Sequence, residues 1–420
     1  MNNSKSKNPL IKENLEALSS FIENINCLYE TFQYSELMLK QQKRDCNKAI
    51  FKKLEDWGLD PNRDSGEIEL SSDKVREVNK LIKKQRRAES AFDLIPRSYI
   101  VSLISLFDAF IGNLIRNIYA ICPEKLNSSD QKISFSELVS FGSIEEAKDT
   151  IVENKIESIL RESHHDQFDF IAKELAISTL KEFENWPNFI EITQRRNLFV
   201  HTNALVSSQY LSVCKKHKVK GIDSLSKGDK LDVNREYFEN AFTIFYEIAV
   251  KLSQIVLRVL LGKKNETVIE ELDDNLITII FDLIAERRYK IAIELSNFAL
   301  MPKFKHNNAT RIYMILNMAQ AFKWNGNNEK CVEILEKEDS SAWNNELKMA
   351  KEVLLDRNEK AIILMEAIGS QSKIFDMESY RTWPIFNKIR STDIFKETFN
   401  KIFNEPLDYD TKFMPNFPSE

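Results

Sequence analysis

A histidine, an asparagine and an arginine lie close together in this chain, and their types suit the cleavage of a phosphodiester bond. Residues 196–201 read RNLFVH. His201 can act as an acid or a base at neutral pH because the free pKa of histidine is about 6.5. Arg196 can hold the non-bridging oxygens of a phosphate through parallel N–H donors, and Asn197 can position the phosphate or the histidine. RNA carries its own nucleophile, the 2′-hydroxyl, so we expect no metal and no cofactor.

The segment around these residues places polar groups in an otherwise apolar helical pattern. At about 100° per residue, one stripe of the expected helix should face a core: Phe189, Ile192, Phe199 and Val200. Arg196 lies in the middle of this stripe, and its flank carries Gln194, Asn197 and His201. Two interpretations remain open. The arginine and the histidine are either structural, as a buried ion pair and a satisfied interior side chain, or they face a functional pocket.

Asp108 is a second charge in an apolar setting. The chain is apolar on almost every face from Tyr99 to Tyr119, which is typical of a helix in the middle of a bundle. A buried carboxylate and a buried guanidinium each need a partner. We therefore expect Asp108 to support Arg196 by pairing with it across the bundle. Arg116 is the alternative partner for Asp108.

The same segment resembles the signature of HEPN domains, which are helical nucleotide-binding and ribonuclease domains common in toxins and phage-defence proteins. Many members carry a polar residue, Arg-Arg-Asn, two apolar residues and Val-His, followed two residues later by Asn. This chain reads QRRNLFVH at residues 194–201, with Asn203 two residues beyond. The resemblance implies catalytic roles for Arg196, Asn197 and His201 and supporting roles for Gln194, Arg195 and Asn203. Helix phase favours Arg196 over Arg195 as the residue that faces the cleft.

One histidine per chain is few for a reaction that uses both an acid and a base. HEPN nucleases dimerise so that two signatures share one cleft. The resemblance therefore implies a homodimer with a composite site, an RNA substrate and a product that ends in a 2′,3′-cyclic phosphate. On this basis we predict a metal-independent endoribonuclease that acts as a toxin-like or antiphage-defence effector.

Two other functions are compatible with the sequence. The first is a non-catalytic nucleotide-binding or scaffold protein whose C-terminal half recruits a partner. The second is a nucleic-acid-binding adaptor, which the net charge of −5 makes the least favourable of the three. That charge argues against strong non-specific binding of nucleic acid by the whole surface, although it allows a local basic groove.

Composition predicts an all-α chain of more than one domain. The chain has 420 residues, too many for one compact core. Its 9 Gly and 10 Pro lie between long periodic runs, as in helices joined by short turns. The 5 Cys have no paired spacing, so they indicate neither a disulfide framework nor a zinc framework. Cysteine usage and the lack of a signal peptide favour the cytoplasm. We expect no membrane span, because the apolar run Ala241 to Leu261 contains three charged residues.

We expect three domains and a tail. Residues 1–91 should form a long helical hairpin, with one helix from Leu10 to about Trp57 and another from Asp73 to about Ala88. A break or a kink is expected near Pro96. Residues 92–262 should form the HEPN-like antiparallel bundle of five helices. Residues 268–405 should form helical repeats, and residues 406–420 a flexible tail.

The repeats are visible when the chain is aligned on three lysines. Lys290, Lys330 and Lys360 each begin a similar apolar segment, and each follows a polar turn. Their spacings of 40 and 30 residues bracket the roughly 34-residue period of tetratricopeptide (TPR) helical hairpins. The segments resemble degenerate TPR repeats, which stack helices and leave a concave surface for a peptide or protein partner.

Two other groups of residues were considered as binding sites. Lys215, Lys216, Lys218 and Lys220 follow the signature closely and are predicted to guide RNA, although an exposed basic loop is the alternative. The basic run at residues 83–87 has the same two interpretations. His164 and His165 are adjacent and should point to different faces, so we expect no two-histidine metal site there, and we expect Asp166 to cap the next helix.

Overall fold

The chain is mostly helical in the part that the structure describes. The computed structural model describes residues 9–60, 70–128, 134–262, 265–372 and 374–408. These ranges contain sixteen α-helices and no strand, which confirms the predicted all-α class. A single isolated β-bridge joins Leu205 and Lys230. The chain divides into two compact units, Met1–Leu260 and Leu261–Glu420, and each is described by itself.

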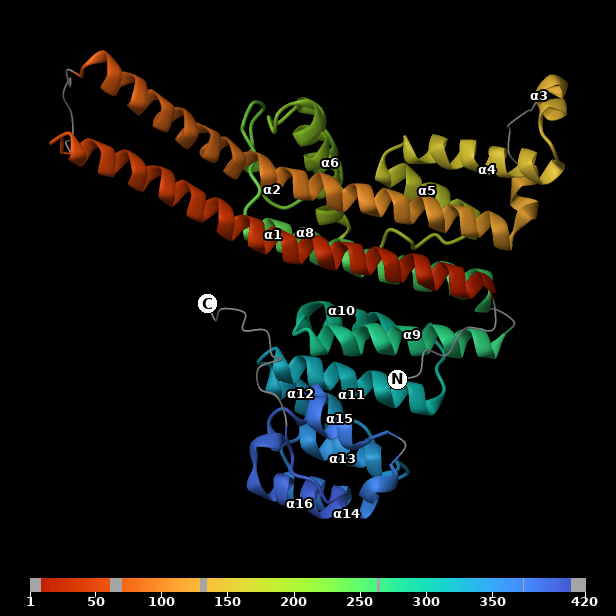
Figure 1. The fold of residues 1–420 in the computed structure, drawn as a ribbon. Coiled ribbons are helices and arrows are strands. Elements are labelled where there is room, and N and C mark those ends of the chain that lie inside the picture. Colours follow the sequence, from red (N-terminus) through yellow and green to blue (C-terminus); the bar gives the residue numbers. More distant parts are fainter. Residues whose placement is uncertain (1–8, 61–69, 129–133, 263–264, 373, 409–420) are drawn as a thin grey trace. The chain divides into compact units, whose positions relative to one another are not determined.

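The first unit is organised around three long helices. Helices α1 (Pro9–Asp56) and α2 (Ser72–Ile121) form an antiparallel hairpin, and α8 (Arg235–Leu260) packs against both of them (Figure 1). Aromatic rings fill the space between the three helices. The Phe32 ring stacks 4.1 Å from that of Phe238, and the Phe107 ring lies 5.0 Å from that of Phe245. Burial of such rings is the main stabilising contribution of this core.

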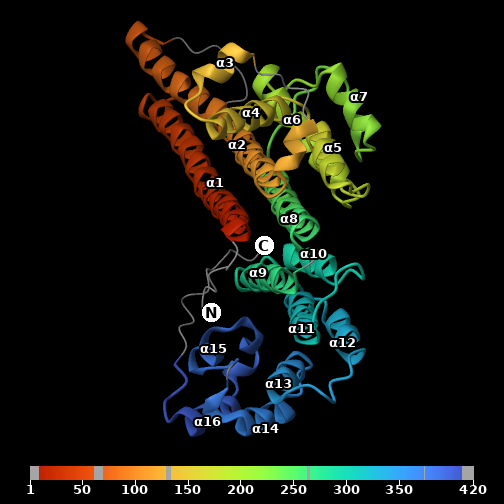
Figure 2. The same ribbon diagram turned by 90° about the vertical axis from the view of Figure 1, so that its right-hand side faces the viewer.

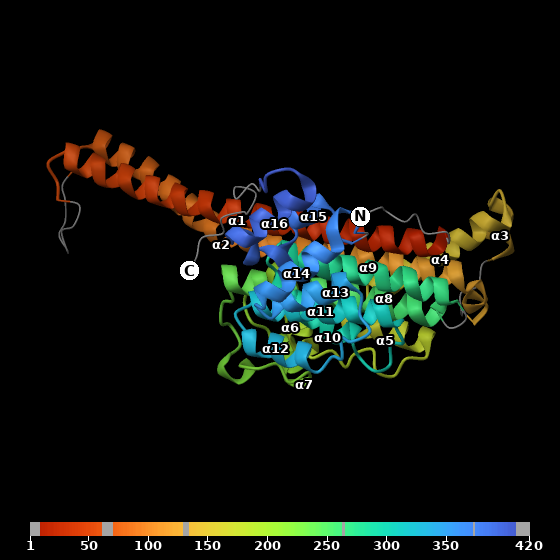
Figure 3. The same ribbon diagram turned by 90° about the horizontal axis from the view of Figure 1, so that it is seen from below.

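Helix α2 differs from the sequence expectation. It runs unbroken from Ser72 to Ile121 with Pro96 inside it, so the predicted end near Ala88 is wrong and the helix does not break at Pro96. A proline removes one backbone donor, but α2 is packed against α1 over much of its length, and this packing maintains the helix across that position. Residue 91 lies inside α2, so the hairpin and the bundle belong to one unit. The turn end of the hairpin projects beyond the other helices of this unit (Figure 3).

The described part of residues 92–262 contains seven α-helices, where five were expected for the bundle. The remaining helices of the first unit are all shorter than α1, α2 and α8. They are η1 (Pro123–Ser128), α3 (Phe135–Ser140), α4 (Ile144–Leu160), α5 (His164–Leu175), α6 (Trp186–His201), α7 (Ser208–Lys216) and η2 (Ile222–Ser224). The N-cap of α5 is Ser163, whose hydroxyl accepts a hydrogen bond from the Asp166 amide. Asp166 was expected to be the cap, and it lies instead in the first turn of the helix.

The second unit contains three consecutive helix pairs. The pairs are α9 (Glu266–Ala285) with α10 (Tyr289–Ala299), α11 (Asn308–Trp324) with α12 (Asn328–Glu336), and α13 (Asn345–Leu354) with α14 (Asn358–Ile368). The chain continues through η4 (Gly369–Gln371), α15 (Met377–Thr382), η5 (Pro384–Phe386), η6 (Ile389–Ser391) and α16 (Asp393–Phe403). Helix α16 packs against α14 (Figure 1). Most of the predicted tail, residues 409–420, lies outside the described residues.

The three helix pairs share one turn geometry. Arg287, Gly326 and Asp356 have left-handed φ values of 61°, 84° and 58°. In each turn the amide of the next residue donates to the carbonyl five residues earlier, at 2.7, 2.9 and 2.9 Å. This is the Schellman arrangement that satisfies carbonyls at a helix C-terminus. The three aligned lysines each lie in the first turn of the second helix of a pair, so the repeat seen in the sequence is the helical hairpin.

The shared turn predicts the effect of one substitution. Gly326→Ala should lower the unfolding free energy by about 1 kcal/mol, because a left-handed φ strains any residue with a Cβ. A Cβ at position 326 would meet nothing within 4 Å, so the cost is in the backbone alone. Urea unfolding followed by tryptophan fluorescence measures the change. Gly326→Asn is the matched control and should lower the unfolding free energy by less, since asparagine tolerates this conformation. Equal stability of Gly326→Ala and the parent would contradict the left-handed turn.

Candidate functional site

Helix α6 is anchored in the core at its beginning. Phe189 and Ile192 are 0% and 1% exposed. Asn185, the residue before the helix, donates to Glu247 at 3.0 Å, and the ammonium of Lys251 donates to the same carboxylate at 2.6 Å. Glu247 and Lys251 are both buried on α8, so this ion pair fixes the start of α6.

The predicted pairing of Asp108 with Arg196 is confirmed. The Arg196 Nη2 atom lies 3.7 Å from Asp108 Oδ2, and both side chains are about a quarter exposed. Arg116, the alternative partner, is exposed and donates to Asn113 at 3.1 Å. The ion pair joins α6 to α2 in the first unit.

His164 is a third member of this group that the sequence analysis did not identify. Its Nε2 atom lies 2.9 Å from Asp108 Oδ1, and its side chain is 11% exposed. The imidazole packs 5.8 Å from the ring of Phe189, measured between centroids. His164 begins α5, fifty-six residues after Asp108 in the sequence, and no local pattern connects the two.

We refer to Asp108, His164, Arg196 and Asn197 as the α6 cluster. The Arg196 Nη1 atom donates to Asn197 Oδ1 at 3.2 Å. The Nε atom of Arg196 is buried, and it has no hydrogen-bond partner among the described residues. The Arg196 side chain as a whole is about a quarter exposed, so its guanidinium can still meet an anion from solvent. The cluster therefore combines a fixed cation, a carboxylate, an imidazole and an amide.

His201 and Gln194 are not part of this cluster within one chain. His201 is the last residue of α6 and is exposed. Across the described part of the chain, neither side chain makes a hydrogen bond or an ion pair. Val200 was expected to face the core, but it is 51% exposed because α6 ends at the surface. Arg196 and His201 thus lie in different environments on the same helix.

Arg195 belongs to a buried network around Glu191. The Arg195 Nε atom donates to Glu191 at 2.7 Å, and its guanidinium lies 4.1 Å from the centre of the Tyr237 ring. The hydroxyls of Tyr210 and Tyr237 donate to the same carboxylate at 2.6 and 2.9 Å. Burial, together with the Glu191 charge, raises the pKa of both tyrosines far above the usual value. Arg195 is therefore engaged in packing, and it is Arg196 that meets Asp108.

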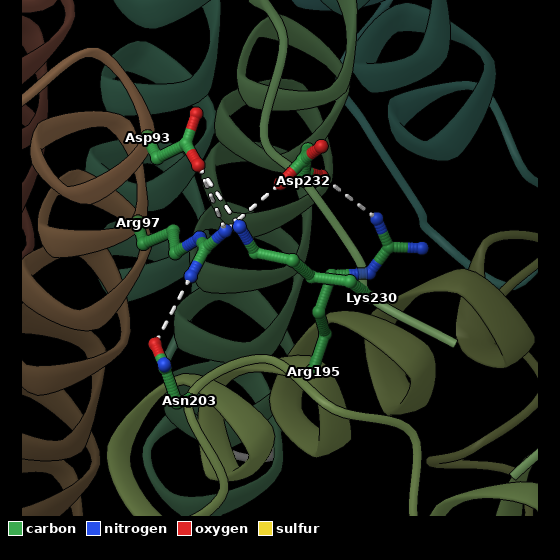
Figure 4. A network of polar contacts seen from close by, with 6 residues as sticks. All are labelled: Asp93, Arg97, Arg195, Asn203, Lys230 and Asp232. Atoms are coloured by element: carbon green, nitrogen blue, oxygen red, sulfur yellow. Dashed lines mark hydrogen bonds and ion pairs between the residues drawn. The ribbon is translucent and has the colours of Figure 1, made fainter. Parts of the chain in front are cut away.

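Asn203 is held in a separate polar network after the end of α6 (Figure 4). Arg97, which is 5% exposed, donates to Asn203 at 3.4 Å and to Asp232 at 2.8 Å. Lys230 donates to Asp93 at 2.9 Å, and Arg195 donates to the Asp232 carbonyl at 3.3 Å. Asn203 has a left-handed φ of 51°. This network fixes the loop that follows α6, and it contains Arg97, which the sequence analysis did not identify.

The predicted RNA-binding lysines lie on the same unit as α6. Lys215 and Lys216 end α7, and Lys218 and Lys220 follow in the next turn. All four are exposed, and Lys215 lies 3.3 Å from Asp223. Helix α7 packs on α6 through a shared apolar cluster that includes Leu198, Tyr210 and Cys214. The exposure of the four lysines is compatible with RNA binding and with a simple exposed basic loop. The same holds for the basic run at residues 83–87.

Comparison of the chain with models of known protein families, with curated protein sequences and with solved structures finds no significant match. Of the described helices, α2 alone is long and apolar enough to cross a membrane. Half of its most apolar window is buried inside the first unit.

The Glu191 network predicts a pH dependence of stability. Tyr210 and Tyr237 have folded-state pKa values raised above the unfolded value of about 10. Each therefore stabilises the fold fully below pH ~10, and this stabilisation is lost as the pH rises above that value. Tyr210→Phe should reduce the loss by up to about 1.4 kcal/mol per pH unit above pH ~10 and change nothing near pH 9, as measured by urea unfolding between about pH 9 and 11. Identical pH slopes for the parent and the variant would contradict a buried, protonated Tyr210.

Proposed function

We propose that this protein is a metal-independent endoribonuclease of the HEPN type. Arg196 binds the scissile phosphate, Asn197 positions it, and His201 transfers protons. The observation that carries the proposal is the Arg196 guanidinium, which pairs with Asp108 on one side while its side chain stays about a quarter exposed. A preorganised cation of this kind stabilises the charge that develops on the phosphate in the transition state.

The proposed reaction is an internal transesterification. The 2′-oxygen of RNA forms a bond to phosphorus, and the bond from phosphorus to the 5′-oxygen breaks. One imidazole accepts the proton of the 2′-hydroxyl, and a protonated imidazole donates a proton to the departing 5′-oxygen. The products are a 2′,3′-cyclic phosphate and a 5′-hydroxyl end. No metal takes part in these steps.

The need for two imidazoles leads to the proposed homodimer. His201 is exposed at the end of α6 and has no polar contact within the described chain, which leaves it available to a second subunit. Exposed apolar side chains lie near His201 in sequence or next in sequence to Asp93 of the Asn203 network, as a subunit interface requires: Leu94, Val200 and Leu205. The site would then contain residues of two chains.

The rest of the chain is assigned supporting roles in this proposal. The exposed lysines at positions 215, 216, 218 and 220 attract the RNA backbone. The helix pairs of the second unit resemble TPR repeats and bind a protein or peptide that controls the nuclease. Such a protein acts in the cytoplasm as a toxin-like or antiphage-defence effector.

A non-catalytic scaffold or nucleotide-binding protein is the second candidate. It is favoured by the position of His201, which makes no contact with Arg196 within one chain. In that case the ion pair of Arg196 with Asp108 stabilises the bundle, and the helix pairs carry the function.

The nuclease proposal predicts metal-independent cleavage. The purified chain should cut total RNA or a tRNA in EDTA, and His201→Ala should reduce the rate about 100-fold or more because it removes the proton-transfer group. Arg196→Gln should reduce the cleavage rate by a comparable factor. The matched control is Arg161→Gln, since Arg161 is the exposed residue after α4 and pairs only with Glu157 among its described neighbours.

The products should carry 2′,3′-cyclic phosphates, detected by their resistance to ligation until the ring is opened. Equal cleavage by the parent and His201→Ala would overturn the assignment of the catalytic residue. A folded, dimeric parent that cuts no RNA would favour the scaffold candidate.

A further inference from the structure

The turn end of the α1–α2 hairpin carries a strong positive charge. The two helices run side by side toward it (Figure 2), and it projects beyond the other helices of the first unit (Figure 3). Residues 76–87 of α2 contain six Lys or Arg and one acidic residue, whereas the whole chain has a net charge of −5. All six cations are exposed: Arg76, Lys80, Lys83, Lys84, Arg86 and Arg87. Positive charge is thus concentrated on one projecting segment of an acidic chain.

Four of these cations form a single row along α2. They follow one another at intervals of four, three and four residues, so they share one face of the helix: Arg76, Lys80, Lys83 and Arg87. At 1.5 Å per residue, the row is roughly 16 Å long. None of the four side chains makes an ion pair or a hydrogen bond with the residues that the structure describes. We refer to these four residues as the α2 row.

The opposite side of the same segment packs on α1. The Gln85 amide donates to Asn47 of α1 at 3.0 Å, and Ala88 is 1% exposed. The one acidic residue of the segment, Glu77, lies 2.9 Å from the ammonium of Lys53 on α1. The α2 row therefore faces solvent, and no carboxylate of its own segment neutralises it.

Helix stability does not account for this arrangement. Like charges three or four residues apart on a helix repel each other and destabilise it. The α2 row contains three such neighbouring pairs, and Lys84 and Arg87 form another. An ordinary solvated helix face mixes acidic and basic residues along its length. A charge pattern that costs stability and has no internal partner is typical of a surface that binds a polyanion.

We propose that the α2 row binds the phosphate backbone of a nucleic-acid duplex. Residues 72–91 contain no Phe, Trp or Tyr, so this segment has no aromatic side chain on which unpaired bases could stack. A helix that lies on an anionic membrane carries Trp, Phe or Leu beside its cations. Here Leu81 and Ile82 are partly buried on the side of α2 that carries Gln85 and faces α1.

The contacts of the α2 row are to phosphates, so binding is independent of base sequence. The duplex is an RNA duplex because the proposed nuclease acts on RNA. This choice rests on the proposed function, whereas the phosphate contacts do not. The substrate class of the proposed nuclease is then folded RNA that contains paired stems.

Equilibrium binding of a short, fluorescently labelled RNA duplex to the full chain tests the inference. Every 2′-hydroxyl of the duplex is methylated, which removes the nucleophile, so binding is measured without cleavage. The parent should bind, and the logarithm of its affinity should fall linearly with the logarithm of the salt concentration. Lys80→Gln combined with Lys83→Gln should weaken binding roughly tenfold or more at about 0.1 M salt. The salt slope should fall by about 2, because each phosphate contact contributes roughly 0.9 to it.

A control variant removes the same charge elsewhere. Lys290→Gln combined with Lys360→Gln changes two exposed lysines of the second unit and should leave both the affinity and the salt slope unchanged. If the α2 variant loses its helical circular dichroism signal, Arg76→Gln combined with Arg87→Gln decides in its place.

Four results would overturn the proposal. They are a parent that does not bind the duplex, equal weakening by the α2 variant and the control variant, weaker binding with an unchanged salt slope, and a parent that binds vesicles of anionic phospholipid in preference to the duplex. Tighter binding of a DNA duplex of the same sequence would overturn the choice of RNA. Cleavage of RNA by a chain that does not bind the methylated duplex would contradict this inference alone, so its failure is distinct from a failure of the nuclease proposal.

Discussion

The charge of Arg196 is the constraint on which the α6 cluster depends. A guanidinium cannot lose its proton inside a helical bundle, so it needs an opposite charge nearby. Asp108 on α2 supplies that charge, and the same carboxylate contacts His164 at the start of α5. One carboxylate therefore connects three helices that are distant in the sequence. Because both members of the ion pair remain partly exposed, the interaction orients Arg196 more than it stabilises the fold.

The residues on different sides of helix α6 have different roles. Phe189 and Ile192 pack in the core, and Glu191 holds Arg195 together with two tyrosine hydroxyls. With the neighbouring arginine fixed in this way, Arg196 is directed toward Asp108. Chemistry that needs a fixed cation and a mobile imidazole is consistent with this division, since His201 lies free at the exposed end of the helix.

The sequence predicted those features that depend on local pattern or on unmet charge. The pairing of Asp108 with Arg196 followed from two charges in apolar stripes, and the helix pairs of the second unit followed from the lysine-aligned repeat. The sequence did not reveal His164 or Arg97, because their partners lie at distant positions in the chain. The continuity of α2 through Pro96 was also missed, since it depends on packing against α1. Val200 was predicted to face the core and is exposed, because the apolar periodicity of the sequence does not show that α6 ends at the surface.

An experimental structure of the full chain in its solution oligomer is the most direct test of the composite site. We expect a two-fold dimer in which the exposed ends of the two α6 helices meet. Both His201 side chains should then border one cleft that also contains both Arg196 guanidinium groups. A monomer, or a dimer whose His201 side chains lie on opposite faces, would contradict a composite site and would leave Arg196 as a structural residue of the bundle.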